Sequence, residues 1–474
     1  MSLLKKRGAV FALFQALVLM SFLRICLAPT AAWARIVSVG LVVGQPSLSV
    51  SSVSAITAVD GSGKKQVLGT AAAFRMSGSN SVVVGNRTFR LPITLSSRHA
   101  LAFDGRRYRG TFRLIASGSG MTLINALDLE EYLRGVLKME VNPAWSMEAL
   151  KAQAIISRTY ALRSVLQNSG KGGYDLRDSV MSQVYRGMNA EDPKTDEAIR
   201  ATKGMVLKYG SEIAFTPFHS HSGGATADVS TVWGGNMPYL KGVNESFRTE
   251  SPHSSWEARL TVAQVEEALR SAGVNVGRLQ ELRVEQTDSF GRATTLRAIG
   301  TIGSQTLKSH SFRMAAGSNI IRSTVFTIAS AGTASPAPAA LPPLPQPNVQ
   351  PSSSPGATNV PTSLTPMSAA EEQMLTELTE KGVFNAEELM DMLLNPDKRK
   401  GYLIRALRTI RPGIPAQPQP QPVGSSSGQF HFRGKGWGHG VGLSQWGAKA
   451  LADQGWDFKK ILSFYYPGTK LERM

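Results

Sequence analysis

Short apolar runs separated by turn-forming pairs dominate residues 35–127, and the spacing of apolar positions then becomes helical. The runs are rich in Val, Ser, Thr and Gly, and pairs such as Asp60-Gly61 mark turns between them. Short runs of this kind predict β-strands. The clearest predicted strands are 36–43, 81–84, 111–115 and 121–127. We therefore expect a β-rich N-terminal region.

A helix is predicted from Asp128 onward, with a glutamate on its apolar side. Asp128 and Glu131 have the spacing of a capping box. Leu129, Leu133 and Val136 recur at helical spacing, and Glu140 lies about 20° around the helix from the first of them.

The Asn142-Pro143 pair ends this helix, because the residue before proline disfavours helical geometry. Glu140 then lies at an open helix end that a substrate can reach. A second helix is expected directly afterwards, so that residues 128–166 are mainly helical.

Glu140 has two interpretations at this stage. A carboxylate on an apolar face is costly unless it is paired or its pKa rises until it is protonated near neutral pH, and a raised pKa is what a general acid needs. The alternative is a structural ion pair with Arg134, Lys138 or Arg158. The local sequence does not decide between them.

Composition divides the remaining chain into further segments. Residues 167–330 mix strands with helices predicted at 261–272 and 312–321. The predicted organisation is a signal peptide (1–34), a β-rich region (35–127), the first part of a catalytic domain (128–334), a Pro/Ser-rich linker (335–366), a helical insertion (367–411), a Pro/Gln-rich linker (412–428) and a closing segment of the catalytic domain (429–474). The closing segment is too short for an easy core of its own, so we expect it to pack against residues 128–330. A separate small tail domain is the alternative. The predicted fold class is α+β, with the β-rich region packed with a mixed α/β catalytic domain.

The first 34 residues predict export. Lys5-Lys6-Arg7 precede an apolar stretch at 9–23, and Ala32-Trp33-Ala34 has the small-x-small form of a cleavage site. The stretch is short for a membrane span. Arg24 interrupts the approach to the cleavage site, so an uncleaved membrane anchor is the alternative. The expected location is the periplasm or cell envelope.

Charge and cysteine content narrow the chemistry. The formal charge is +18, and removal of the four basic residues of the signal leaves +14. Export argues against nucleic acid as the partner and favours an anionic envelope polymer. The alternative is that the charge serves general solubility and identifies no partner. The only cysteine, Cys26, lies within the signal, so the mature chain offers no thiolate nucleophile or zinc ligand. No serine lies in a Gly-x-Ser-x-Gly elbow.

A second candidate segment is TPFHSHSGGATADVSTVWGG, residues 216–235. His219 and His221 are two apart and would share one face of a strand. A pair of histidines is a weak metal signal without a third ligand such as Asp228, and hydrogen bonding by these side chains is the favoured interpretation. Ser220 and Ser222 are candidate sugar hydrogen-bonding residues.

The third candidate segment is GKGWGHGVGLSQWG, residues 434–447. It lacks the Lys-Ser/Thr ending of a phosphate loop. Trp437 and Trp446 are either sugar-stacking platforms or core residues. His439, Ser444 and Gln445 are further candidate substrate contacts.

These segments together resemble the sporulation stage II protein D family, also called the amidase-enhancer family. The matching stretches are LEEYLRGVLKMEVNPAWSMEALKAQAIISRTYAL, FHSHSGGATADVSTVWGGNMPYLKGV, FRMAAGSNIIRSTVF and GKGWGHGVGLSQWGAKALADQGWDFKKILSFYYPGTKL. Four blocks in the same order make the match specific.

The resemblance implies a peptidoglycan lytic transglycosylase that favours glycan strands stripped of stem peptides. The family's catalytic glutamate corresponds to Glu140, as general acid to the glycosidic oxygen and then base toward the muramyl 6-hydroxyl. Gln153, Arg158 and Tyr160 follow on the next helix, with Arg158 a candidate for binding a muramyl carboxylate. Neither a cofactor nor a metal site is predicted. Some relatives bind zinc through cysteines that this chain lacks, and a zinc hydrolase using His219 and His221 is the third hypothesis. The second hypothesis is a non-catalytic protein that binds the cell wall and recruits or stimulates an amidase.

Overall fold

The computed structural model describes residues 35–168, 172–178, 183–330 and 428–474, together with seven residues between 371 and 403. Those seven residues are helical. Three predicted segments lie outside the described residues: the signal peptide, the first linker and most of the helical insertion. Of the second linker, only its last residue, Gly428, is described. Within the described part of the chain, no helix is both long and apolar enough to span a lipid bilayer.

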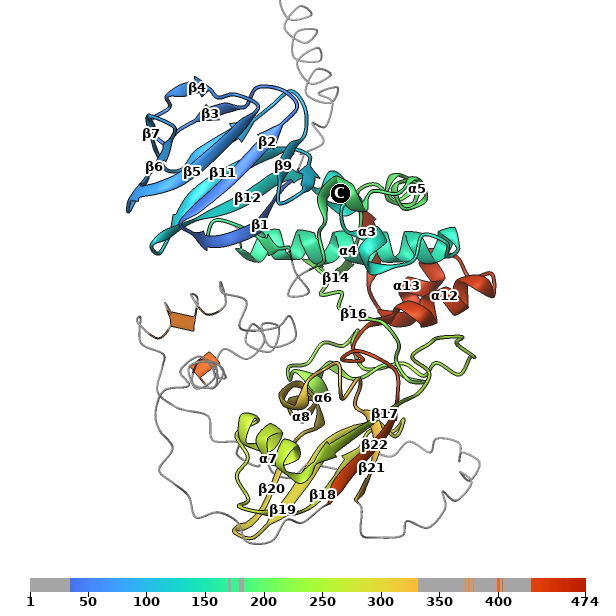
Figure 1. The fold of residues 1–474 in the computed structure, drawn as a ribbon. Helices are drawn as coiled ribbons and strands as arrows, with labels where there is room; N and C mark the ends of the chain where they lie inside the picture. The colour runs from blue at the N-terminus through green and yellow to red at the C-terminus, as the bar shows by residue number, and fades with distance from the viewer. Residues whose placement is uncertain are drawn as a thin grey trace, which may run out of the picture. The chain divides into compact units, whose positions relative to one another are not determined.

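Two β-sheets form the N-terminal region (Figure 1). One has the strand order β13-β1-β12-β11-β8-β3-β4 and the other the order β10-β9-β2-β5-β6-β7. The strands are β1 (Ile36–Gln45), β2 (Ser47–Ser52), β3 (Thr57–Val59), β4 (Lys65–Val67), β5 (Ala71–Gly78), β6 (Ser81–Val84), β7 (Arg87–Arg90), β8 (Ile93–Ser96), β9 (Leu101–Phe103), β10 (Arg106–Tyr108), β11 (Thr111–Ser117), β12 (Gly120–Asp128) and β13 (Leu176–Arg177). All four predicted strands are confirmed as β1, β6, β11 and β12.

Alternation of side chains explains how the two sheets share a core. In β5, Ala72 and Phe74 are buried while Ala71, Ala73 and Arg75 are exposed. Because successive side chains of a strand point to opposite faces, one face of the sheet is apolar and the other meets solvent. The buried side chains of both sheets form one apolar cluster, which continues into the helices that follow.

The helical region is interrupted where the sequence predicted one helix. Residues 128–166 contain α2 (Leu129–Arg134), α3 (Leu137–Glu140) and α4 (Met147–Asn168). The prediction of an unbroken helix up to Glu140 is therefore wrong. The break lies at Gly135, where a Cβ atom would come within 2.4 Å of the Tyr185 ring. The tyrosine therefore packs against the bare glycine backbone.

The start of α2 also differs in detail from the predicted capping box. Asp128 caps the helix by accepting a hydrogen bond from the main-chain N–H of Glu130 at 2.8 Å. Glu131 instead forms ion pairs with Arg109 and Arg134. The predicted end of the helix before Pro143 is confirmed, since Val141 is extended.

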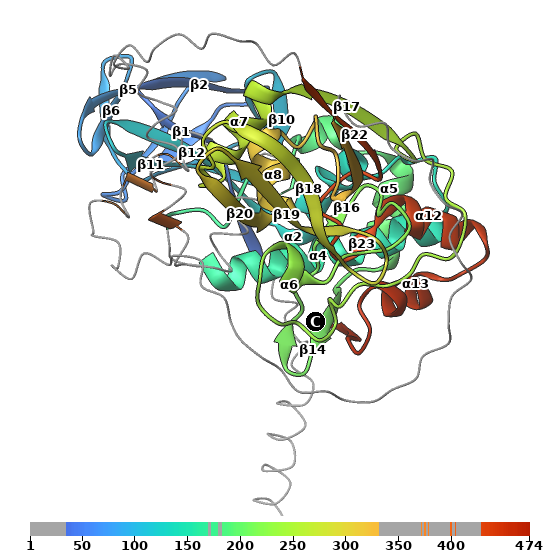
Figure 2. The ribbon, with the colours of Figure 1, turned by 90° about the horizontal axis from the view of Figure 1, so that it is seen from below.

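The closing segment joins the elements between residues 187 and 330. These are η1 (Gly187–Ala190), α5 (Pro193–Ala201), β14 (Met205–Tyr209), β15 (Glu212–Ile213), β16 (Phe218–His219), α6 (Val229–Val232), β17 (Trp256–Thr261), α7 (Val262–Ser271), β18 (Leu279–Thr287), β19 (Ala293–Gly300), β20 (Gly303–Lys308), α8 (Ser309–Ala316) and β21 (Val325–Ser330). The closing segment adds β22 (Gln429–Lys435), β23 (Leu443–Ser444), α12 (Gln445–Asp453), α13 (Phe458–Tyr465) and β24 (Lys470–Arg473). Strand β22 lies between β17 and β21, β23 pairs with β16, and β24 pairs with β14. Figure 2 shows β22 beside β17. The residues after 428 thus pack against residues 128–330, as the sequence predicted.

The two helices predicted beyond residue 260 have different outcomes. The helix predicted at 261–272 is confirmed as α7, whose N-terminal Thr261 forms a capping box with Gln264. The helix predicted at 312–321 is α8, which begins at Ser309 and ends at Ala316. Gly317 ends it with a φ of 102°, a conformation that favours glycine.

Candidate active site

Glu140 is the last residue of α3, and its carboxyl group contacts the main chain of a separate segment. The residue is half-buried, and its Oε1 accepts a hydrogen bond from the main-chain N–H of Val184 at 3.3 Å. Burial raises the pKa of Glu140 from 4.5 to about 7, against the smaller opposite effect of that hydrogen bond. Among the described residues, no charged group contributes to this shift. Glu140 is therefore an unpaired carboxyl group that is largely protonated below neutral pH.

Two tyrosines lie close enough to Glu140 for their acidity to depend on its charge. Burial raises the pKa of Tyr160 to about 12, and the Glu140 charge adds to this shift. Tyr132 is fully buried, and burial likewise raises its pKa well above the ordinary value, with a contribution from Glu140. Both phenols therefore stay protonated and can only donate or accept hydrogen bonds near neutral pH.

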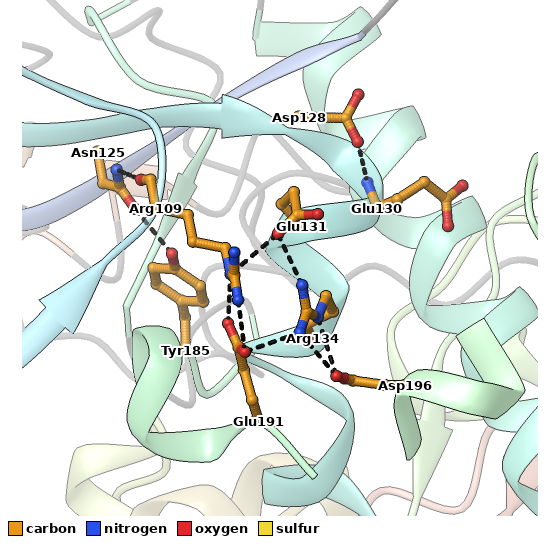
Figure 3. Close-up of polar contacts among 9 residues, drawn as sticks. All are labelled: Arg109, Asn125, Asp128, Glu130, Glu131, Arg134, Tyr185, Glu191 and Asp196. Atoms are coloured by element: carbon orange, nitrogen blue, oxygen red, sulfur yellow. Dashed lines mark hydrogen bonds and ion pairs between the residues drawn. The ribbon is translucent and has the colours of Figure 1, made fainter. Parts of the chain in front are cut away.

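Arg134, one of the three cations considered as an ion-pair partner of Glu140, belongs to a separate ion-pair network. Arg134 lies 3.1 Å from Glu131, 2.8 Å from Glu191 and 2.8 Å from Asp196. Arg109 joins the same network through Glu131 at 3.0 Å and Glu191 at 2.6 Å. Figure 3 shows the two arginines between these three carboxylates. Arg134 therefore serves a structural network that does not include Glu140.

The other two candidate cations are also engaged elsewhere. Lys138 lies 3.9 Å from Asp192, and Arg158 forms a bidentate pair with Glu130 at 2.8 Å for both hydrogen bonds. The remaining N–H groups of Arg158 donate to Thr202 Oγ1, Met205 O and Ile199 O. Arg158 is fully buried and all five of its donors are engaged, so the prediction that it binds a muramyl carboxylate is wrong for this structure. None of the three cations proposed as partners therefore forms an ion pair with Glu140.

Helix α4 carries two further candidate residues, Gln153 and Tyr160, and only Tyr160 is partly exposed. Tyr160 is half-buried and lies near Glu140, as its pKa shift shows. Gln153 is 1% exposed and donates through Nε2 to Ser157 Oγ at 3.3 Å. Its position fits a role inside the helix packing better than direct contact with a polymer.

The closing segment meets the end of α3. Gln445 Nε2 donates to the main-chain oxygen of Glu140 at 3.1 Å. The rings of Trp145 and Trp446 lie 5.2 Å apart in an edge-to-face contact. Ser444 is fully buried and caps α12 by accepting from the Gly447 N–H. Residues about 300 positions apart in the chain thus fix the helix end that carries Glu140.

Ser220 connects the second segment to Trp446 at this junction. Its main-chain oxygen accepts a hydrogen bond from the Trp446 N–H at 3.0 Å, and it is half-buried. Ser222, by contrast, is 1% exposed and donates to Glu245 Oε2 at 2.6 Å. Tyr465 donates to the other oxygen of this carboxylate at 2.7 Å. Ser222 therefore belongs to a buried polar cluster.

The histidines of both segments bind the protein's own main chain or hydroxyl groups. His219 Nδ1 lies 3.2 Å from Val441 O. His221 Nδ1 accepts from a main-chain N–H at 3.2 Å, and its Nε2 lies 2.7 Å from Thr249 Oγ1. Both residues are 4% exposed, and burial lowers the pKa of His221 to about 4. His439 lies 3.0 Å from Phe218 O through Nε2 and accepts from the Val441 N–H through Nδ1.

These contacts favour structural roles for the three histidines. Across the described ranges, no group of three His, Cys, Asp or Glu side chains has the arrangement of a metal site.

Four residues near Glu140 were missed by sequence reasoning. Tyr132 donates to Gln183 Oε1 at 3.2 Å, Val184 binds the carboxyl group, and Trp145 packs on Trp446. Tyr132 stands on the same predicted helix as Glu140, so its nearness to the carboxylate had a local signal. Gln183 and Val184 had none, because they come from a separate loop.

Comparisons with known proteins bear out the resemblance found in the sequence. The sequence model of the family described as Stage II sporulation protein (SpoIID) matches residues 117–209, which include Glu140. An uncharacterized protein of Brachyspira hyodysenteriae is 28% identical over 236 residues, covering 50% of this chain and 63% of that protein. The "Amidase enhancer" of Bacillus subtilis is 30% identical over 189 residues, covering 40% of this chain and 25% of that protein. The "Stage II sporulation protein D" of the same organism is 31% identical over 161 residues, covering 31% and 47%. The chain thus spans less than two thirds of each relative's length.

Proposed function

We propose that this chain, which carries a SpoIID domain at residues 117–209, is an exported lytic transglycosylase of peptidoglycan. The observation that supports this most directly is the state of Glu140. Its carboxyl group has no ion-pair partner among the described residues, has a pKa of about 7, and lies at a helix end bordered by partly exposed aromatic side chains. A general acid that works near neutral pH needs these properties.

The proposed reaction uses Glu140 twice. First, its carboxyl group gives its proton to the oxygen of the bond between N-acetylmuramic acid and N-acetylglucosamine, and the bond from that oxygen to muramyl C1 breaks. The resulting carboxylate then takes the proton of the muramyl 6-hydroxyl, whose oxygen bonds to C1. The product is a 1,6-anhydro ring, and Glu140 is protonated again. No water is consumed, so a second carboxylate to activate water is not required.

Residues near Glu140 are proposed to position its carboxyl group and to contact the glycan. Gln445 holds the main-chain oxygen of Glu140 and so fixes the helix end relative to the closing segment. Tyr160 offers a protonated phenol within electrostatic range of the carboxyl group. Trp145 and Trp446 are half-buried and offer apolar faces on which sugar rings stack. Ser220 remains a candidate hydrogen-bonding residue for the glycan.

A second candidate function is supported by one of the relatives. The Bacillus subtilis protein named amidase enhancer is 30% identical over 189 residues. This chain would then bind glycan without cleaving it and stimulate a cell-wall amidase. The two functions differ in their dependence on Glu140, because a binding role needs no proton donor.

The test of the proposal is a digest of purified glycan strands without stem peptides. Wild-type protein and Glu140→Gln are incubated in parallel, with Glu212→Gln as a control at an exposed glutamate. Products are separated and identified by mass. We expect anhydro-muramyl products from wild type and control, and a loss of roughly 10²- to 10⁴-fold in the Glu140 variant.

Absence of anhydro product from wild type, or equal activity of Glu140→Gln, would overturn the catalytic proposal. Glycan pull-down and amidase stimulation that are both retained in Glu140→Gln would favour the amidase-stimulating function.

A further inference from the structure

The N-terminal β-rich region holds half of the chain's net positive charge. Residues 35–127 contain eleven Lys and Arg against two acidic residues, a balance of +9 where the whole chain has +18. Asp60 is 7% exposed, and its Oδ1 accepts hydrogen bonds from Ser62 Oγ at 2.6 Å and from the Ser62 and Lys64 N–H groups at 3.0 Å. The other acidic residue of the region, Asp104, lies in the turn between β9 and β10. The region therefore has almost no acidic group with which to neutralise its own arginines.

Three of these arginines lie on the outward face of the six-stranded sheet. Arg75 is exposed on β5, between the inward-facing Phe74 and half-buried Met76. Arg90 on β7 follows the buried Phe89 and is exposed. Arg107 on β10 precedes the buried Tyr108 and is also exposed. The small or hydroxyl-bearing residues on this face are Ser47, Ser49, Ser51, Ala71, Ala73, Ser81, Thr88 and Ala102.

The strand register arranges the three arginines on one diagonal. Arg107 is in register, through Ala102 and Ser51, with Ala71 of β5. Arg75 is four residues further along β5, and Arg90 lies beyond it, in register with Ser81. Strand spacing of about 4.8 Å and a rise of about 3.4 Å per residue place neighbouring arginines roughly 12 to 20 Å apart. We name these three residues the arginine diagonal.

The arginine diagonal differs from the adjacent arginines in lacking carboxylate partners. Arg106 lies 3.4 Å from Asp178, and Arg109 forms ion pairs at the edge of the sheet. Within the described residues, none of the three diagonal arginines lies within ion-pair distance of a carboxylate. Arg107 acts on Glu191 only at longer range, as one of the smaller causes of that residue's lowered pKa. Three guanidinium groups without carboxylate partners among the described residues thus face solvent on one side of the sheet.

We propose that the arginine diagonal binds a glycan strand whose muramyl residues carry free carboxylates; this rests on the proposed function. Stripping the stem peptide leaves one carboxylate on each muramyl residue, which makes the strand a linear polyanion with regularly spaced charges. Arginine binds carboxylates through two parallel hydrogen bonds. The serines and threonine between the arginines offer hydroxyl groups to a hydrated polymer. A protein partner is disfavoured, because the centres of protein interfaces are rich in aromatic and large apolar side chains, and this face has none apart from half-buried Val83.

One end of the arginine diagonal lies beside a segment that leads to Glu140. The main-chain N–H of Arg107 donates to Asn189 Oδ1 at 3.2 Å. Asn189 lies on η1, five residues after Val184, which binds the Glu140 carboxyl group. The diagonal therefore gives long strands a second attachment, separate from the point of cleavage.

The test measures binding in a Glu140→Gln background, so that turnover does not enter. The diagonal variant is R75Q/R90Q/R107Q. The control is K64Q/K65Q/R98Q, which removes the same charge from exposed residues of the same region that are off the diagonal. Each exposed contact is worth roughly two- to fivefold in affinity. For long glycan strands with free carboxylates, we expect the diagonal variant to bind about ten- to hundredfold more weakly and the control to change Kd by less than about threefold. An unchanged melting temperature of each variant shows that the fold is intact.

Two further probes test the ligand chemistry. The same strands with their carboxylates converted to methylamides should bind wild type and diagonal variant equally weakly, and inorganic polyphosphate should compete poorly. The inference is overturned if the diagonal variant and the control bind alike, if the methylamide strands bind as tightly as the acid form, or if polyphosphate competes equally well. Failure of the proposed function would appear elsewhere, as absence of anhydro product from wild type.

Discussion

Replacing Glu140 by glutamine should stabilise the protein above neutral pH. In the unfolded chain the carboxyl group ionises near pH 4.5, whereas burial in the folded protein raises its pKa to about 7. As the pH rises from 4.5 to 7, the unfolded chain loses this proton while the folded protein retains it. The folded wild type therefore loses stability over this window and carries the full cost of a buried charge above pH 7.

The size of the effect follows from the shift. A change from 4.5 to about 7 corresponds to about 3 kcal/mol, and partial exposure of the residue reduces the expected value to about 2 kcal/mol. Glutamine has nearly the same shape and never ionises. Glu140→Gln should thus unfold at the same denaturant concentration as wild type at pH 4 and at a higher one at pH 8.

The assay is equilibrium denaturation of wild type and variant across this pH range, followed by tryptophan fluorescence. Glu212→Gln, at an exposed residue of β15, is the matched control and should show no pH-dependent gain. A Glu140 variant that is equally stable at both pH values, or less stable than wild type at pH 8, would refute the assignment of a buried, unpaired carboxyl group.

Further predictions concern the fold, the reaction and metals. Arg158→Ala should lower the free energy of unfolding by about 3 kcal/mol, because it leaves Glu130 without its cation; lost cleavage at unchanged stability would restore a substrate-binding role. Gly135→Ala should cost about 1–3 kcal/mol, since the new methyl group meets the Tyr185 ring at 2.4 Å, and an unchanged melting temperature would contradict this packing. The kcat/KM of cleavage should fall about tenfold per pH unit above pH 7 as Glu140 loses its proton; a rate that rises there would exclude it as the acid. Chelation with EDTA should leave cleavage unchanged, whereas the zinc-hydrolase hypothesis requires bound metal and loss of activity.

Features that depend on neighbouring residues in the chain could be predicted from the sequence. The strand predicted at 81–84 coincides with β6, and α7 begins and ends within one residue of its predicted bounds, because its capping box and apolar spacing are local. The end of α3 before Pro143 followed from proline geometry. Glu140 was identified because a carboxylate is unusual on the apolar side of a predicted helix.

Features that depend on distant contacts could not be predicted. At the break, Gly135 packs against the ring of Tyr185, which is 50 residues away in the chain. The ion pair of Arg158 depends on Glu130, which lies on α2 and is 28 residues away in the chain. Glu245 had no signal at all, since its partner Tyr465 is 220 residues away. Spacing along one helix cannot show which charges meet across the core, and this is why Arg158 was assigned to the substrate.

The central claim, that Glu140 alone supports an intramolecular cleavage, is tested most directly by the fate of solvent oxygen. Glycan strands without stem peptides are digested by wild type and by Glu140→Gln in water labelled with heavy oxygen, and the muramyl ends are weighed by mass spectrometry. The account predicts that wild type gives anhydro ends without label and that the variant gives almost none. Labelled reducing ends, or the same anhydro product from Glu140→Gln, would contradict it.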